Sequence, residues 1–184
     1  ITDFDITQRM VRLILQRVGV SRFNRPRVVI CVPSAITPVE RRAVTEACRR
    51  SGASDAQLIE QPLAAAIGAD LPIGEAFGSM VVDVGGGTSE SALLSLGGVV
   101  ELEAVRIGSF DIDRAIQAHV RREYGLAIGE RTAEEIKWTI GSAAETPGEG
   151  RAEVKGREMM TGMPKTVILT PAEIRNAIDD PVSA

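Results

Sequence analysis

The stretch MVVDVGGGTSESALLSLGGVV, residues 80–100, places three consecutive glycines, Gly85 to Gly87, between two apolar runs. Asp83 stands just before these glycines and Thr88 just after them. Apolar runs rich in valine and leucine, bounded by glycine turns, predict strands of a sheet. The glycines therefore join two strands and serve one of two purposes. They form a turn that only needs to be tight, or a loop whose backbone comes close to a ligand.

A loop of this composition suits phosphate oxygens. The backbone N–H groups of Gly85, Gly86, Gly87 and Thr88 can form a concave, partly positive nest, and glycine avoids a Cβ that would block close approach or forbid a positive φ. The Asp83 carboxylate can hold Mg²⁺ or its waters, which bridge to phosphate, and the Thr88 hydroxyl can reach the phosphate or an attacking water. A P-loop and a dinucleotide loop are both excluded, because GxxxxGK[ST] is absent and a strand follows the glycines.

Alternating strands and helices are predicted before the glycine loop. RVVICVP, residues 27–33, is a continuous apolar run typical of a parallel strand covered on both faces. A helix follows, with a capping box formed by Thr37 and Glu40. AQLIE, residues 56–60, predicts a short strand, and Pro62 opens an alanine-rich helix. This order indicates parallel pairing and an α/β layer. A further helix, DITQRMVRLILQRVG, opens the chain, with Asp5 as its expected N-cap.

The pattern changes after residue 78. Three successive strands are predicted, separated by short glycine turns, and indicate an antiparallel meander: SMVVDV, ESALLSL and VVELEAV. A helix is expected over residues 111–124, and a second one behind a capping box of Thr132 and Glu135. Residues 151–170 predict a hairpin, and Pro171 begins a last helix.

The composition excludes several classes of protein. With 44% apolar and 25% charged residues, the chain of 184 residues is typical of a soluble globular protein. A net charge of -4 gives no support for a nucleic-acid partner. Cys31 and Cys48 are expected to be reduced and buried, and the single histidine, His119, excludes a histidine cluster and is expected at the surface or its boundary. No apolar run approaches the roughly 20 residues that span a bilayer. Because the chain begins at Ile1 inside an amphipathic pattern, we expect a fragment.

Several segments, in order, resemble one family. They are RVVICVPSAITPVERRAVTEA, LIEQPLAAAIGADLPIGEAFGSMVVDVGGGTSE, IGERTAEEIKWTIGSA and GMPKTVILTPAEI. DVGGGT between two strands resembles the second phosphate loop of the actin, DnaK and sugar-kinase superfamily. Within that superfamily the segments are similar to the MreB-type bacterial actins (the MreB/Mbl family), and the resemblance covers essentially the whole chain.

The resemblance implies an α/β, actin-like ATPase fold of two ribonuclease-H-like lobes, each of them incomplete. Residues 1–78 correspond to the C-terminal part of domain I. Residues 79–184 correspond to the N-terminal part of domain II, with a small α+β inserted subdomain at about residues 109–170. The family's first phosphate loop is expected before residue 1 and its adenosine loop after residue 184.

The resemblance also assigns site residues. It places the phosphate loop on Gly85, Gly86, Gly87 and Thr88, and the magnesium-associated aspartate on Asp83. The helix TAEEIKWTIG corresponds to one that contacts the adenosine of ATP.

That helix implicates Glu134 and Lys137, which lie three residues apart and therefore on one helical face. The alternative for this pair is a solvent-exposed ion pair of small energy. In RIGSFDID, residues 106–113, the family commonly has two glycines followed by an acidic residue, and Ser109 and Phe110 alter this loop.

Gln61 is a second departure from the family. The family usually has two glutamates before the proline, and the second one orients the attacking water; here the stretch reads Glu60–Gln61–Pro62. A glutamine can hydrogen-bond water but cannot act as a general base. We therefore expect slow hydrolysis of ATP at most, coupled to filament dynamics, and no activity from the isolated chain.

The function that the resemblance implies is that of a cytoplasmic protein that binds ATP and Mg²⁺, self-associates into filaments beneath the membrane, and guides cell-wall synthesis and cell shape. Its implied partners are cell-wall elongation or sporulation-wall proteins, with peripheral contact to the membrane. One alternative is a truncated, non-hydrolysing interaction module that binds the cell-wall machinery. Another is a sugar kinase or a DnaK-like ATPase, since one fold supports several functions.

Overall fold

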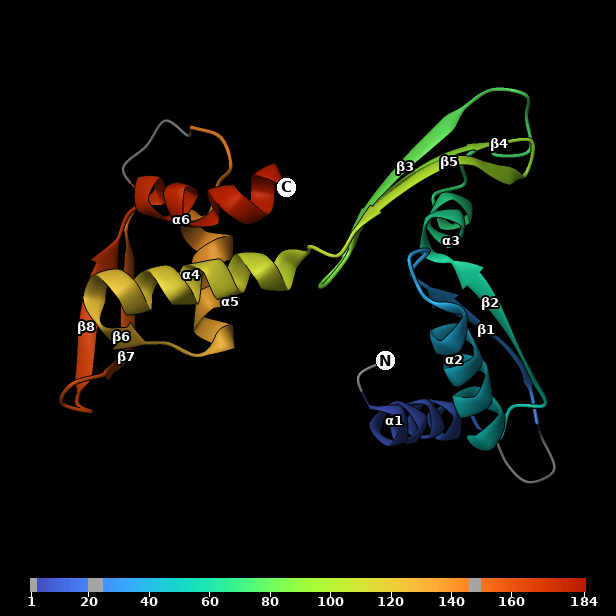
Figure 1. The fold of residues 1–184 in the computed structure, drawn as a ribbon, viewed down its shortest axis with the longest axis horizontal. Coiled ribbons are helices and arrows are strands. Elements are labelled where there is room, and N and C mark those ends of the chain that lie inside the picture. Colours follow the sequence, from blue (N-terminus) through green and yellow to red (C-terminus); the bar gives the residue numbers. More distant parts are fainter. Residues whose placement is uncertain (1–2, 20–24, 146–149) are drawn as a thin grey trace. The chain divides into compact units, whose positions relative to one another are not determined.

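The structure, a computed structural model, describes residues 3–19, 25–145 and 150–184 (Figure 1). The chain forms two compact units. Unit 1 contains the residues up to Asp83 together with Glu90–Val105, and unit 2 contains Val84–Ser89 together with Arg106–Ala184. Among the helices that the structure describes, none is long and apolar enough to cross a membrane. The division into lobes at residue 78 that the sequence implies stays a prediction.

Unit 1 contains a parallel pair of strands, as predicted. The strands are β1 (Arg27–Val32) and β2 (Asp55–Glu60), with Val32 opposite Glu60. The helices are α1 (Phe4–Arg17), α2 (Pro38–Arg50) and α3 (Gln61–Gly68). Side chains from α1, α2, β2 and the segment before β2 form a small buried cluster: Leu15, Cys48, Ala53 and Ala56.

The prediction that β1 is covered on both faces is wrong for the described residues. Val29 is 65% exposed, and Cys31 is exposed as well. Cys31 is therefore not buried, whereas Cys48 is, and burial raises the pKa of the Cys48 thiol. Both cysteines are free thiols, as expected. Valine-rich runs indicate a strand reliably, but they do not tell which of its faces meets another layer.

The starts of α1 and α2 show what capping signals can and cannot locate. Thr37 and Glu40 form the predicted capping box at the start of α2. The N-cap of α1, in contrast, is Asp3, whose carboxylate accepts a hydrogen bond from the backbone N–H of Ile6 at 3.0 Å. Asp5 lies in the first turn instead, where a negative charge favours the helix dipole. Asp3 and Asp5 are only two residues apart, and both fit the sequence preference for aspartate as an N-cap.

A three-stranded sheet contains the glycine loop between its first two strands. The strands β3 (Ser79–Val84), β4 (Ser89–Ser95) and β5 (Gly98–Val105) lie in that order. Their short connections require neighbouring strands to run antiparallel, as the meander prediction expects. Glu90 in β4 is buried and accepts hydrogen bonds from Ser34, at 2.8 Å from its backbone nitrogen and 3.1 Å from its hydroxyl. This contact attaches β4 to the segment that follows β1.

Unit 2 packs three helices with a small antiparallel sheet. The helices are α4 (Ser109–Tyr124), α5 (Glu130–Ile140) and α6 (Pro171–Ser183), and the strands are β6 (Leu126–Ala127), β7 (Ala152–Glu158) and β8 (Pro164–Leu169), in the order β6-β7-β8. The predicted hairpin is confirmed as β7 and β8. All six elements contribute to one apolar core: Ile116, Val120, Leu126, Ala133, Ile136, Ile140, Val154, Val167, Leu169, Ile174 and Ile178.

The predicted capping box at Thr132 and Glu135 is wrong. Helix α5 begins three residues earlier, with Gly129 and not Thr132 as its N-cap, so Thr132 lies within the first turn. Glu135 accepts a hydrogen bond from Arg131 at 3.3 Å. At the start of α6, Thr170 and Glu173 form a capping box in which each side chain accepts a hydrogen bond from the other residue's backbone N–H.

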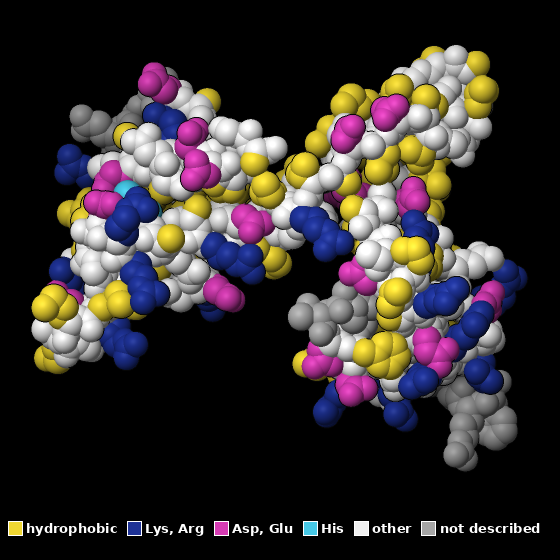
Figure 2. Space-filling view, in the orientation of Figure 1, with side chains coloured by type: hydrophobic (Ala, Val, Ile, Leu, Met, Phe, Trp, Pro, Cys, Tyr) yellow, Lys and Arg dark blue, Asp and Glu magenta, His cyan; other side chains and the backbone are white. Residues whose placement is uncertain are grey.

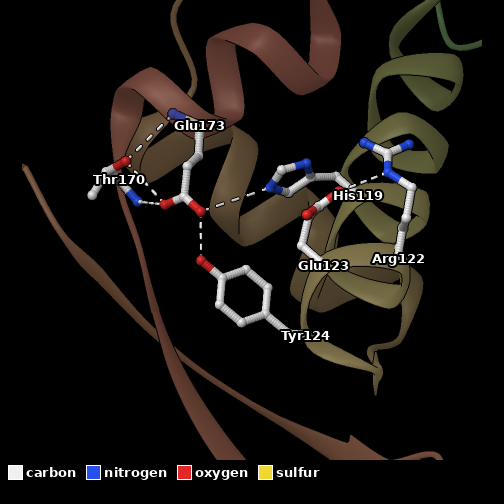
Figure 3. Close-up of polar contacts among 6 residues, drawn as sticks. All are labelled: His119, Arg122, Glu123, Tyr124, Thr170 and Glu173. Atoms are coloured by element: carbon white, nitrogen blue, oxygen red, sulfur yellow. Dashed lines mark hydrogen bonds and ion pairs between the residues drawn. The ribbon is translucent and has the colours of Figure 1, made fainter.

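A partly buried polar cluster attaches α6 to α4 (Figure 3). The Tyr124 hydroxyl donates a short hydrogen bond to Glu173, and the Nε2 atom of His119 lies 3.9 Å from the same carboxylate oxygen. Burial by itself raises the pKa of Glu173, but the hydrogen bonds from Tyr124 and Thr170 outweigh it and lower that pKa. The bond to Glu173 raises the pKa of Tyr124 to about 12. His119 is buried, so its expected surface position is wrong.

Candidate functional site

The glycine loop, residues 85–88, is fixed against the start of α4. Within the loop, the Gly85 N–H donates to the Thr88 carbonyl at 2.8 Å. The loop's own carbonyls are held from outside: Ser109 N–H donates to Gly85 O at 3.0 Å and Phe110 N–H to Gly86 O at 2.8 Å. A helix start leaves its first backbone N–H groups without partners inside the helix. In α4 the first two of these groups donate to carbonyls of the glycine loop.

The backbone N–H donors of the glycine loop, unlike its carbonyls, are largely without partners. Within the part of the chain that the structure describes, the N–H groups of Gly86, Gly87 and Thr88 donate no hydrogen bond. Successive free N–H groups in a short loop form a partly positive concavity that suits an anion. Gly87 is exposed, and a Cβ added there would meet nothing within 4 Å. The loop therefore has free donors and free space where a phosphate group could bind.

Close packing, and not a positive φ, is the reason for a glycine at position 86 of this loop and at position 108 beside it. None of Gly85, Gly86 and Gly87 has a φ in the left-handed region, so that part of the sequence argument is wrong. A Cβ on Gly86 would lie 2.6 Å from the Phe110 ring. A Cβ on Gly108 would lie 2.7 Å from the backbone oxygens of both Gly85 and Gly86. Gly86 and Gly108 are therefore tightly packed, whereas Gly87 leaves a free surface on the same loop.

Lys137 supports the loop from α5. Its ammonium lies 2.9 Å from the Ser109 hydroxyl and 3.4 Å from the Ser109 carbonyl oxygen. It also lies 2.9 and 3.1 Å from the two carboxylate oxygens of Asp113, which is buried. Ser109 in turn donates its backbone N–H to Gly85. Lys137 and the glycine loop are therefore connected through one residue.

Glu134 and Lys137, which the sequence places on one helical face, have different surroundings. Glu134 is exposed and lines a surface pocket together with Phe110 and Asp113. Lys137 has only 17% of its side chain exposed and pairs with Asp113. The alternative of an exposed Glu134–Lys137 ion pair is thus wrong. The sequence showed Asp113 near this region but gave no reason to choose it as the partner.

The remaining predicted residues belong to unit 1. Asp83 is half-buried near the end of β3, joined to the glycine loop through Val84, and its carboxylate has no partner among the described residues. Gln61 is half-buried and begins α3 directly after β2. The neighbouring Glu60 is already paired with Arg41, at 3.0 Å. Gln61 is therefore the side chain left available at this strand end.

The site has a sparse set of metal ligands. Across residues 3–19, 25–145 and 150–184, no group of three or more His, Cys, Asp or Glu side chains could hold a metal ion. Mg²⁺ keeps several waters in proteins and commonly takes one or two carboxylates plus phosphate oxygens. Asp83 alone fits such a site when a phosphate group supplies the other ligands.

The fold is that of an actin-like ATPase, as the sequence predicts. The crystal structure of MreB5 of Spiroplasma citri bound to ADP matches with a TM-score of 0.89 and 31% sequence identity, covering 100% of this chain and 55% of that one. The structure of MreB5 of the same organism bound to AMPPNP matches with a TM-score of 0.88 and 30% identity, covering 98% of this chain and 55% of that one.

The relationship extends to sequence. The family model described as MreB/Mbl protein matches residues 1–184. The cell shape-determining protein MreB of Escherichia coli (strain K12) is 48% identical over 185 residues, covering 100% of this chain and 53% of the relative. The cell shape-determining protein Mbl of Bacillus subtilis (strain 168) is 36% identical over 184 residues, covering 100% of this chain and 55% of the relative. The chain belongs to the MreB/Mbl family, and it spans about half the length of the curated relatives it matches.

Proposed function

We propose that this chain is part of a bacterial actin-like cytoskeletal protein that binds ATP, polymerises beneath the membrane and guides cell-wall synthesis and cell shape. The family membership and the names of the relatives support the cell-shape role. The ADP and AMPPNP in the related structures support nucleotide binding. The observation in this chain that carries the proposal is the set of free N–H groups at Gly86, Gly87 and Thr88.

The proposed roles follow from chemistry available in the loop. The three free N–H groups donate to phosphate oxygens, and the Thr88 hydroxyl donates to the same phosphate or to the attacking water. Asp83 holds Mg²⁺ through its waters, and the bound ion neutralises phosphate charge. Gln61 orients the attacking water by hydrogen bonds but accepts no proton from it, so hydrolysis is slow.

The adenosine contacts are proposed for α5. Glu134 is exposed and lines the pocket with Phe110, so its carboxylate is free to accept hydrogen bonds from ribose hydroxyls. The Lys137 ammonium has three donors, and it already lies near Ser109 and Asp113. A contact from Lys137 to the nucleoside therefore requires the exchange of one of these acceptors for a ligand atom.

The proposed partners are further copies of the protein in filaments and cell-wall elongation or sporulation-wall proteins, with peripheral contact to the membrane from the cytoplasm. Filament formation is supported by membership of the MreB/Mbl family. A truncated, non-hydrolysing interaction module that binds the cell-wall machinery is the alternative, and the free donors of the glycine loop argue against a complete loss of nucleotide binding. The affinity of this chain for ATP bears on both functions, because a chain that does not bind the nucleotide cannot hydrolyse it.

The test is calorimetric titration of the 184-residue chain with ATP and Mg²⁺. Gly87→Asp introduces a negative side chain into free space at the loop, so it should fold normally and abolish binding. Gly129→Asp is the matched control: its Cβ also meets nothing within 4 Å, and it lies at the N-cap of α5, where aspartate is favoured. Saturable binding that only Gly87→Asp removes supports the proposal. A folded chain without binding would favour the interaction module.

A further inference from the structure

A second pocket of unit 2 shares Arg114 and Gln117 with the pocket that Glu134 lines, and no residue of the glycine loop lines it. It has a volume of about 540 Å³ and is lined by residues of α4, of β6 and β7, and of the segments that follow these strands. Three arginines, Arg114, Arg121 and Arg157, line it together with Gln117 and apolar side chains that include Ile128 and Met159. No aspartate or glutamate is part of the lining. Figure 2 shows dark-blue Lys and Arg side chains along the part of unit 2 where Figure 1 draws α4.

The walls of this pocket are held together by specific contacts. The Gln117 side-chain amide donates to the Ile128 carbonyl at 3.2 Å, which joins α4 to the segment after β6. On the other side, a Cβ added to Gly156 would lie 2.6 Å from the Ala127 carbonyl oxygen, so glycine lets β6 approach β7 closely. The pocket is therefore a fixed feature of the packing of this unit.

The positive charge in the pocket is largely uncompensated. Arg114 pairs with Asp111 at 3.2 Å, but its side chain is 75% exposed, so the pair is weak. In the stretches that the structure describes, Arg121 and Arg157 have no acidic partner. Arg122, next to Arg121 on the same helix, does pair, with Glu123 at 2.8 Å (Figure 3). Arg121 also lies in the last turn of α4, where a cation favours the helix dipole.

We propose that this pocket binds a phosphate monoester. Guanidinium groups match the oxygens of phosphate with two parallel hydrogen bonds, and a monoester carries about -1.5 to -2 charges at pH 7. The two unpaired arginines, Arg121 and Arg157, can balance that negative charge, and Arg114 lines the same pocket. Ile128 and Met159 give the pocket an apolar wall for the organic group that the phosphate carries. The phosphate belongs either to a small soluble molecule or to the headgroup of a lipid such as phosphatidic acid.

The test uses both sources of this chemistry. Phenyl phosphate is titrated into the ¹⁵N-labelled chain, and binding is followed by shifts of the backbone amide signals of α4 and β7. In a second arm, the chain is sedimented with vesicles of phosphatidylcholine, with or without phosphatidic acid. Saturable binding in either arm supports the proposal, and the arm in which it occurs identifies the source. Absence of binding in both arms would overturn it.

Matched variants locate the binding. Arg121→Gln and Arg157→Gln each remove one exposed, unpaired guanidinium, and each should weaken binding about tenfold or more, since hydrogen bonds to charged groups are strong. Arg122→Gln removes the same charge from the neighbouring position outside the pocket and should change affinity less than about twofold, because it leaves only a surface pair unmade. Equal weakening by all three variants would mean a general charge effect and would refute the site. Gly87→Asp should leave this binding unchanged, which separates it from phosphate binding at the glycine loop.

Discussion

Replacing Gly108 by alanine should destabilise the attachment of the glycine loop to α4. The new Cβ would lie 2.7 Å from the carbonyl oxygens of Gly85 and Gly86 and from the carbonyl carbon of Gly86. These are backbone atoms, so no side-chain rotation relieves the contact. The loop must move away, and the hydrogen bonds from Ser109 and Phe110 to its carbonyls, now 3.0 and 2.8 Å, must lengthen or break.

The expected cost follows from these contacts. Inserting a methyl group into a packed site costs about 1–3 kcal/mol, and each of the two hydrogen bonds contributes about 1 kcal/mol. Alanine at this position gains about 0.5 kcal/mol from a less flexible unfolded chain, because the extended backbone of Gly108, with φ of -158°, suits any residue. We expect a net loss of about 3 kcal/mol in the free energy of unfolding of unit 2, by the same estimates.

Urea denaturation followed by circular dichroism measures this loss, and amide hydrogen exchange locates it at Ser109 and Phe110. Gly87→Ala is the matched control in the same loop, since its Cβ meets nothing within 4 Å. It should change stability by less than about 1 kcal/mol. If Gly108→Ala and Gly87→Ala unfold alike and the two amides keep their protection, then the loop is not held by α4 and the packing argument is wrong.

Other predictions concern the ion pair, the α6 cluster, catalysis and association. Lys137→Met should cost about 3 kcal/mol in urea denaturation, because it leaves the Asp113 carboxylate buried without a partner, and Asp113→Leu in the same chain should restore most of the loss. The pKa of Tyr124 is about 12, above its ordinary value of 10.0. The stabilisation from its hydrogen bond to Glu173 is therefore fully present below pH 10 and should be lost as pH rises through about 12. Thermal melts of Tyr124→Phe should not show this decline. Gln61→Glu should increase ATP turnover in a chain that binds ATP, and unchanged phosphate release would count against the proposed role of Gln61. The exposed edges of β1 and β3 should make the isolated chain self-associate, and a monodisperse monomer in light scattering would contradict this expectation.

Local signals in the sequence were enough for most elements of the fold. The capping box of Thr37 and Glu40 and the parallel pairing of β1 with β2 are confirmed because they depend on a few neighbouring residues and on one apolar run. The burial of His119 was missed, because it depends on Glu173, a residue that comes close only when α6 packs on α4. The capping box of Thr170 and Glu173, in contrast, follows a Thr-x-x-Glu signal that depends on neighbouring residues alone.

The candidate site was predicted in part. The sequence indicated the glycine loop, but the close packing of Gly86 against Phe110, and of Gly108 against the loop backbone, joins residues more than twenty positions apart in the chain. No short pattern encodes such a contact. The pairing of Lys137 with Asp113 likewise joins two helices that only tertiary packing brings together. Where a residue acts through a long-range contact, the sequence supplies candidates and the structure makes the choice.

The most direct measurement of the central claim is an amide NMR titration of the chain with ATP and Mg²⁺, with assigned signals for the glycine loop. The account predicts that the N–H signals of Gly86, Gly87 and Thr88 shift and become protected from hydrogen exchange, because these donors are free before binding. The Gly85 signal should change little, since its N–H already donates to Thr88. Binding of ATP that leaves the Gly86, Gly87 and Thr88 signals unmoved would contradict the account.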